Sequence, residues 1–440
     1  MSNLSQSNAG ESQADFPEWS KRSTIYEVNI RQYTPEGTFE AFEKHLPLLK
    51  ELGVDLLWLM PIHPISKVKR VGSLGSYYAP ADLKAVNPEF GTLDDFKRLV
   101  HKAHDLGFKV LLDWVANHTG WDSVWIDNKS WYVTDEVGNI QSPSEWTDVA
   151  ELNFNNSDMC LAMMDAMKFW VSEADIDGYR ADHAVGVPLR FWEEARVALE
   201  AIKPVYMLAE DNTKFDFLKK AFHANYGWDL FYNIMKGIPS GEKGAQDIKR
   251  YVDRIKQQYP LGSYPMNFIT NHDTNSWEGT TAEMFGEAEK TMAVLSFTLP
   301  GMPLIYSGQE IGIDQRLEFF YKDEINWTDT KNLRRFYQRL IQLKKQNAAL
   351  YNGSAGGEVK FLETSDSRIL AFQREKDGQC VISVLNLSNE EVSGTVNMTT
   401  TSKLYAVLDP SEVTLNLQHS FVLNPWDIHL FSSVTLTDQD

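Results

Sequence analysis

Short apolar runs that end on acidic residues recur along this chain, and segments with helical spacing separate them. Strand-like runs at 108–114, 177–182 and 205–209 illustrate the pattern, because each carries or directly precedes a carboxylate. The carboxyl ends of parallel strands meet at one edge when helices connect them. We therefore expect several acids to gather at one rim of the fold, and these acids are Asp113, Asp182, Glu210 and Asp273.

The alternation of strand-like and helical segments predicts the fold class. Apolar residues recur with helical spacing at 39–52 and 93–106. The strand candidates are 25–30, 54–60, 108–114, 177–182, 205–209, 266–270 and 303–306. About eight such βα units over roughly 330 residues fit a (β/α)8 TIM barrel better than an open doubly wound sheet. No glycine-rich nucleotide fingerprint follows the first strand, which also argues against the open sheet.

Composition changes along the chain divide it into regions. Residues 1–18 are rich in Ser, Asn, Gln and Glu and are expected to form a disordered tail. The barrel is expected over 19–352, interrupted after its third strand by an aperiodic, tryptophan-rich insertion at 119–156. Alternating apolar runs split by turn residues, such as 380–386, predict an antiparallel β-sandwich over 353–440.

Charge and cysteine content restrict the classes of partner. The chain has 440 residues, and its 42 basic and 61 acidic residues give a formal charge of −19. Such a surface repels nucleic acid and anionic lipid, whereas a neutral sugar meets no such barrier. Cys160 and Cys380 build neither a disulfide framework nor a CxxC metal site. With no signal-like N-terminal segment and no run of 18 apolar residues, a cytoplasmic location is expected.

The acids have the properties that glycosidic-bond cleavage requires. A single acid after a strand is usually a helix cap, but here two of four acids lie beside a histidine. Retaining cleavage uses a nucleophile and an acid/base about 5–5.5 Å apart, in opposite protonation states. Arg180 and Asp182 share a strand face, which favours an ionised Asp182, whereas Glu210 has no adjacent cation. His118 and His272 could donate to sugar hydroxyls, although each could equally be a buried, satisfied histidine.

Four segments resemble, in order, the motifs of glycoside hydrolase family 13, the α-amylase family. They are 113–118, 178–182, 209–210 and 271–273. Supporting segments that resemble the same family are 57–64, 77–82, 85–92 and 301–310. The resemblance extends from about residue 25 to 440, with all of its motifs before about residue 310.

The resemblance implies a role for each residue of these motifs. Asp182 would be the nucleophile, Glu210 the acid/base, and Asp273 a third acid that stabilises the transition state. Tyr78, His118, Arg180 and His272 would hold the sugar, with Asp113 as structural support. The insertion at 119–156 would be the domain B of this family, and the C-terminal β region its domain C.

Some positions depart from the family pattern. Val185 and Gly186 stand where many α-amylases have Lys-His, and His183 after the nucleophile is unusual. Asn117 matches a calcium ligand of the family, but Glu151 replaces the expected Asp. A structural calcium held by these two residues and a main-chain carbonyl is therefore an expectation, although the chemistry itself needs no cofactor.

The leading hypothesis is a retaining hydrolase that cleaves α-1,4 links in starch-like α-glucans or malto-oligosaccharides. An α-glucosidase or a transglycosylase is an alternative, because a sugar can intercept the same covalent intermediate. A non-catalytic carbohydrate-binding member is disfavoured by the intact set Asp182, Glu210 and Asp273. Linkage tolerance, endo or exo action and oligomeric state do not follow from the sequence.

Overall fold

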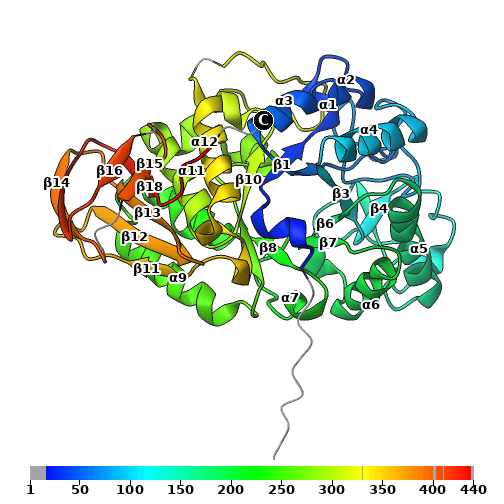
Figure 1. The fold of residues 1–440 in the computed structure, drawn as a ribbon. Coiled ribbons are helices and arrows are strands. Elements are labelled where there is room, and N and C mark those ends of the chain that lie inside the picture. The colour runs from blue at the N-terminus through cyan, green and yellow to red at the C-terminus, as the bar shows by residue number, and fades with distance from the viewer. Residues whose placement is uncertain (1–15, 330, 400–402, 410, 438–440) are drawn as a thin grey trace, which may run out of the picture.

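The computed structural model describes residues 16–329, 331–399, 403–409 and 411–437, and its largest element is a closed barrel of parallel strands. Around the barrel the strands follow the order β1-β10-β9-β8-β7-β6-β3-β2 (Figure 1). Their bounds are β1 Ile25–Val28, β2 Leu56–Leu59, β3 Lys109–Val115, β6 Gly178–Asp182, β7 Tyr206–Ala209, β8 Ala224–Tyr226, β9 Tyr264–Asn267 and β10 Met302–Tyr306. The predicted (β/α)8 barrel is confirmed.

Two strands differ from their sequence-based expectation. β8 was not among the strand candidates, because Ala224-Asn225-Tyr226 is too short to form an apolar run. β9 is Tyr264–Asn267, earlier than the predicted 266–270. Residues 268–270 instead carry the chain from the strand toward Asp273, at the carboxyl end of the barrel.

Helices connect the strands and cover the outside of the barrel (Figure 1). They are α1 Ile30–Tyr33, α2 Phe39–Glu43, α3 Leu46–Leu52, α4 Leu93–Asp105, α5 Ser157–Glu173, α6 Leu189–Glu200, α7 Phe217–Lys220, α8 Trp228–Asn233, α9 Ala245–Gln258, α10 Thr281–Phe285, α11 Glu289–Thr298 and α12 Leu333–Gln346. α4 begins with a capping box between Thr92 and Asp95 and buries Phe96, Leu99 and Val100 on one face.

Alternation of side chains along β6 explains why this strand carries both core and functional groups. Tyr179 lies toward α5, where its hydroxyl donates to the Met167 carbonyl oxygen at 2.5 Å. Arg180 and Asp182, one and three residues further, lie on the opposite face, inside the barrel mouth. Gly178 has φ +147°, and a Cβ there would lie 1.9 Å from the Tyr206 carbonyl oxygen. The close approach of β7 therefore requires glycine at this position.

The insertion after β3 is a small lobe at the carboxyl end of the barrel. It contains a two-stranded antiparallel sheet of β4 (His118–Gly120) and β5 (Val149–Glu151) and a short 3-10 turn at Lys129–Trp131. The lobe ends where the Asn156 side chain accepts from Met159 N–H and caps α5. Because β4 follows β3 almost directly, the insertion lies beside the acids of the barrel rim.

The C-terminal region is an antiparallel β domain beside the barrel (Figure 1). One sheet has the order β11-β12-β13-β18-β15-β16, and β14 pairs with β17. The strands are β11 Val359–Phe361, β12 Ile369–Lys376, β13 Gln379–Asn386, β14 Val392–Asn397, β15 Lys403–Ala406, β16 Glu412–Thr414, β17 Gln418–Leu423 and β18 Ile428–Ser432. Ile369 and Ala371 pack with the β14–β17 pair, whereas Leu370 and Phe372 belong to the barrel-side core. The larger sheet is thus buried on both faces.

Hydrogen bonds with two helices, α11 and α12, fix the β domain to the barrel. Thr291 of α11 donates to the Trp426 carbonyl oxygen at 2.6 Å, and Arg339 of α12 donates to that of Val407 at 2.9 Å. In the opposite direction, the buried Arg374 of β12 donates to the Thr298 carbonyl oxygen at 3.1 Å. These contacts place the β domain at the side of the barrel, away from the insertion.

Of the predicted tail, residues 1–15 lie outside the described residues, while Phe16 packs against His223 and Tyr264. Phe16 therefore belongs to the folded barrel. Among the described helices, none combines the length and the apolar character that crossing a bilayer requires.

Candidate active site

A cavity of about 530 Å³ opens at the carboxyl end of the barrel, a size within the usual range for small-molecule sites. All three predicted catalytic acids line it, together with Tyr78, His118 and His272. The remaining lining residues are Val71, Ser76, Trp146, Asp148, Val149, His183, Trp228, Trp277 and Phe320. Residues more than 200 positions apart in the sequence therefore meet around one void.

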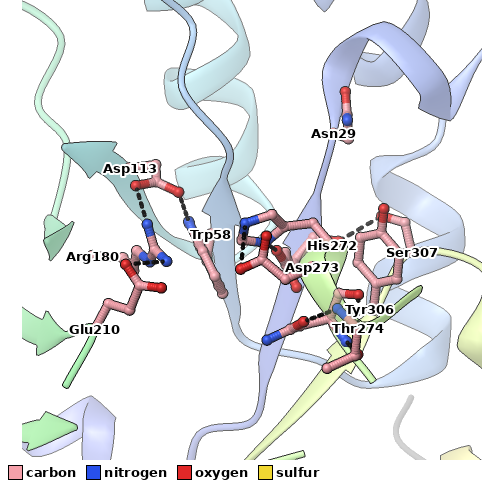
Figure 2. Close-up of polar contacts among 12 residues, drawn as sticks. Asn29, Trp58, Asp113, Arg180, Glu210, His272, Asp273, Thr274, Tyr306 and Ser307 are labelled. Atoms are coloured by element: carbon pink, nitrogen blue, oxygen red, sulfur yellow. Dashed lines mark hydrogen bonds and ion pairs between the residues drawn. The ribbon is translucent and has the colours of Figure 1, made fainter. Parts of the chain in front are cut away.

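Arg180 connects the acids at the base of this cavity. Its Nη1 donates to Oδ1 of Asp113 and to Oδ1 of Asp182, each at 2.9 Å. Its Nη2 lies 3.1 Å from Oε2 of Glu210, an ion-pair contact outside hydrogen-bond geometry. Its Nε donates to the Tyr226 hydroxyl at 2.9 Å. Figure 2 shows Arg180 between Asp113 and Glu210, so one buried guanidinium orients three carboxylates.

Asp113 is fully buried and accepts from three donors. Besides Arg180, Trp58 Nε1 donates to its Oδ2 at 3.1 Å and the Tyr78 hydroxyl donates to the same oxygen at 2.9 Å. Burial raises the pKa of Asp113, and the charge of Arg180 opposes this shift. Donors at both oxygens favour the carboxylate. Asp113 thus holds Arg180 and Tyr78 in place from below the cavity.

Glu210 differs from Asp182 in its surroundings. Burial raises the pKa of Glu210, while the charge of Arg180 lowers it and that of Asp182 raises it. The His183 main-chain N–H donates to Oε2 of Glu210 at 2.7 Å. His183 adopts a left-handed conformation with φ +42°, uncommon for a non-glycine residue. Because Oε2 accepts from the His183 N–H and faces the Arg180 guanidinium, Oε1 is the oxygen of Glu210 that can carry a proton.

His272 lies between two carboxylates and a phenol. Its Nδ1 is 2.5 Å from Oε1 of Glu27, and its Nε2 is 2.9 Å from the Tyr78 hydroxyl and 3.4 Å from Oδ2 of Asp273. Burial lowers the pKa of His272, but the charges of Asp273 and Glu27 outweigh it and raise the pKa to about 9. The Tyr78 ring stacks on the imidazole, with ring centroids 5.5 Å apart.

His118 lines the cavity, but both of its ring nitrogens are bonded within the protein. Nε2 is 3.0 Å from the Tyr78 carbonyl oxygen, and Asn117 Nδ2 is 3.2 Å from Nδ1. Burial lowers the pKa of His118 to about 4, so the ring is neutral at neutral pH. A hydrogen bond from His118 to a sugar would replace its contact with Tyr78.

The predicted calcium ligands lie next to this histidine. Glu151 pairs with His118 across the β4–β5 ladder, and Asn117 directs its amide nitrogen at the His118 ring. The described residues contain no group of three or more His, Cys, Asp or Glu side chains placed to hold a metal. Calcium takes six to eight oxygens, so here it would depend on amide and main-chain oxygens with one carboxylate. The calcium site stays a prediction.

Sequence reasoning did not single out several residues that build the site. Glu27 on β1 and Tyr226 on β8 contact predicted residues that are far away in the chain, and only the folded barrel brings them together. Of the four tryptophans in the insertion at 119–156, Trp146 alone lines the cavity, while Trp125 and Trp131 pack against each other. Trp228 comes two residues after the end of β8, a position that could have indicated it, whereas Trp277 lies in a helical turn at Thr274–Glu278, ten residues after β9.

Comparison with known proteins identifies the family. The family model described as the alpha-amylase catalytic domain matches residues 11–148 and 120–339. The chain therefore belongs to the α-amylase family of glycoside hydrolases, family 13.

Individual relatives are similar over most of the chain. The α-amylase MalA of Haloarcula japonica is 26% identical over 401 residues, which cover 86% of this chain and 57% of that protein. The chain thus spans little more than half of the length of this relative. The maltogenic α-amylase of Bacillus acidopullulyticus is 26% identical over 434 residues, covering 86% of this chain and 72% of the relative. The solved structure of a maltogenic α-amylase from Thermotoga neapolitana superimposes with a TM-score of 0.84 at 26% identity, covering 95% of this chain and 99% of that one.

Proposed function

We propose that this chain is a retaining hydrolase of α-1,4-glucosidic bonds in malto-oligosaccharides or starch-like α-glucans. The observation that carries the proposal is that Asp182, Glu210 and Asp273 line one cavity and that Arg180 contacts the first two. The relatives include enzymes named maltogenic α-amylase and cyclomaltodextrinase, which supports an α-glucan substrate.

The two acids nearest Arg180 suit the two roles of a retaining mechanism. The guanidinium stabilises negative charge on Asp182, as attack on the anomeric carbon requires. The raised pKa of Glu210 favours its protonated form, which would give its proton to the glycosidic oxygen as that bond breaks. After the leaving group departs, Glu210 would take a proton from water, which then attacks the glycosyl–Asp182 ester.

The remaining residues would position the sugar and stabilise the transition state. Tyr78 offers a ring for stacking at the cavity floor, and its hydroxyl is fixed by Asp113 and His272. Asp273 is half-exposed in the cavity and would accept hydrogen bonds from sugar hydroxyls while positive charge develops on the ring. Trp146, Trp228 and Trp277 offer further aromatic faces for neighbouring glucose units.

Incubation with maltoheptaose tests this proposal directly. Product lengths and the anomeric configuration of the new reducing ends should be followed by NMR during the first minutes. We expect shorter maltosaccharides whose new ends are initially α. Initial β ends would exclude retention, and the absence of hydrolysis would exclude the assigned activity. The product pattern also separates hydrolysis from transglycosylation, because transglycosylation yields chains longer than seven units.

A further inference from the structure

The buried carboxylate of Glu27 has no task in the mechanism described above. Glu27 lies on β1 opposite Trp58 and Tyr306 in the barrel ladder, and its side chain is fully buried. Its Oε1 lies 2.5 Å from Nδ1 of His272, and its Oε2 has no hydrogen-bond partner among the described residues. Burying such an acid is unfavourable unless a charge or a strong donor compensates it.

The hydrogen-bond directions around His272 require a proton on Nε2 and a second proton shared between Nδ1 and Glu27. The Tyr78 hydroxyl gives its only proton to Asp113, so its oxygen must accept from Nε2–H of His272. On the other side, Nδ1 faces a carboxylate oxygen of Glu27 and must share a proton with it. A proton on Oε2 of Glu27 would have no acceptor among the described residues, which favours a proton located between Oε1 and Nδ1.

We infer that Glu27 is a positioning residue that keeps His272 as an imidazolium, so that Nε2–H is always available to Tyr78, to Asp273 and to a bound sugar. A charged donor makes shorter and stronger hydrogen bonds than a neutral imidazole. Because its positive charge is balanced by Glu27, His272 can lie in the cavity wall without a substrate present. The ordering of Tyr78 and Asp273 then depends on a carboxylate that the substrate never contacts.

Several other charged and titratable groups lie near the Glu27–His272 pair and act on its charge. Those facing it from the packed elements are Tyr78, Asp113, Arg180, Glu210, Tyr226, Asp273 and Tyr306. Arg180 opposes a second cation nearby, whereas Asp273 favours it. Because the pKa of His272 is raised, the charged form prevails at neutral pH and is lost as the pH rises through about 9. Without the charge of Glu27, this loss occurs at a lower pH.

NMR titration of the full chain labelled with ¹⁵N-histidine tests the inference, with His272→Gln used to assign the signal. Both nitrogens of His272 are expected to be protonated at pH 7 in the wild type. Glu27→Gln should lower the titration midpoint by at least about one pH unit, and Glu27→Asp, which keeps the charge, should lower it less. A wild-type His272 that is neutral at pH 7, or a midpoint unchanged by Glu27→Gln, would overturn the inference. If Glu27→Gln does not fold, the wild-type titration alone decides.

A matched control and a kinetic measurement complete the test. Glu310 is another fully buried acid at this end of the barrel, bonded to Tyr26 at 2.7 Å, so Glu310→Gln should leave the His272 midpoint unchanged. The kinetic expectation rests on the proposed glycosidase function. Glu27→Gln should lower kcat about tenfold at pH 8, and its activity should recover toward pH 6. A pH-independent loss would indicate a merely structural role. The NMR titration needs no turnover, so it separates failure of this inference from failure of the proposed function.

Discussion

Two aspartates lie at opposite ends of the same strand, and their surroundings differ. Asp177 directly precedes β6 and is saturated with donors: His104 Nε2 lies at 2.6 Å, Lys109 and Lys203 Nζ at 3.2 Å, and the Val110 N–H at 2.9 Å. Asp182 ends β6, accepts a hydrogen bond from Arg180, and lines the cavity. Both are nearly buried, at 1% and 9% exposure. Burial of an acid therefore does not indicate catalysis here, whereas unused hydrogen-bonding capacity that faces a cavity does.

The two ends of the barrel also differ in what their charged groups do. At the amino end, two lysines and a histidine surround one carboxylate, which stabilises the fold. At the carboxyl end, five carboxyl groups share Arg180 and His272, an arrangement that favours reactivity over stability. Substitutions at matched positions should therefore change activity at one end and stability at the other.

Asp182→Asn should have the largest effect, because it removes the proposed nucleophile. We expect kcat on maltoheptaose to fall by on the order of 10⁴-fold, while the melting temperature stays within about 3 °C of the wild type. The amide keeps the oxygen that accepts from Arg180, so the fold loses little. Initial rates and thermal denaturation check both values. Near wild-type activity would remove Asp182 from the mechanism.

Glu210→Gln should have the next largest effect, and its size should depend on the substrate. Loss of the proton donor should slow malto-oligosaccharide cleavage by about 10³-fold but slow aryl maltosides with good leaving groups far less. The wild-type rate should decline as the pH rises through the raised pKa of Glu210, because the protonated acid is then lost. This alkaline decline should be absent in the variant. Equal losses on both substrates would contradict the acid role.

Asp177→Asn is the matched control at the other end of β6 and should have the smallest effect on catalysis. We expect about 3 kcal/mol loss of stability with kcat within a few-fold of the wild type. Burial opposes ionisation, but His104, Lys203 and Lys109 outweigh it and lower the pKa of Asp177. Its contribution is therefore present above about pH 4 and lost as the pH falls through the lowered pKa.

Denaturant unfolding at several pH values measures this contribution. The difference in stability between wild type and Asp177→Asn should be largest near pH 7 and should shrink below about pH 4. A difference that stays constant with pH, or a large loss of kcat in this variant, would break the distinction between the two ends of the strand.

The parts of the site that follow local rules could be predicted from the sequence. The two-residue strand period predicts that Arg180 and Asp182 share a face, and their side chains meet at 2.9 Å. Glu210 follows an apolar strand without a nearby cation in sequence, and its pKa is raised as that pattern suggests. The contact of Glu210 with Arg180 was not predictable, because it arises from the neighbouring positions of β6 and β7 in the barrel.

The remaining parts depend on contacts between distant segments. Glu27 and His272 are 245 residues apart, and no pattern within β1 distinguishes Glu27 from an ordinary strand residue. Tyr226 lies on β8, a strand of three residues that has no apolar run. Such positions follow from closure of the barrel, and closure is a property of all eight strands together.

Trapping the covalent intermediate tests the central claim most directly. A fluorinated glucosyl or maltosyl fluoride that forms the intermediate quickly but releases it slowly should be incubated with the enzyme, followed by proteolysis and mass spectrometry. The account predicts that one glycosyl unit is attached to the peptide that contains Asp182, and that Asp182→Asn abolishes this adduct. An adduct on Glu210 or Asp273, or enzyme inactivation without any glycosylated peptide, would contradict it.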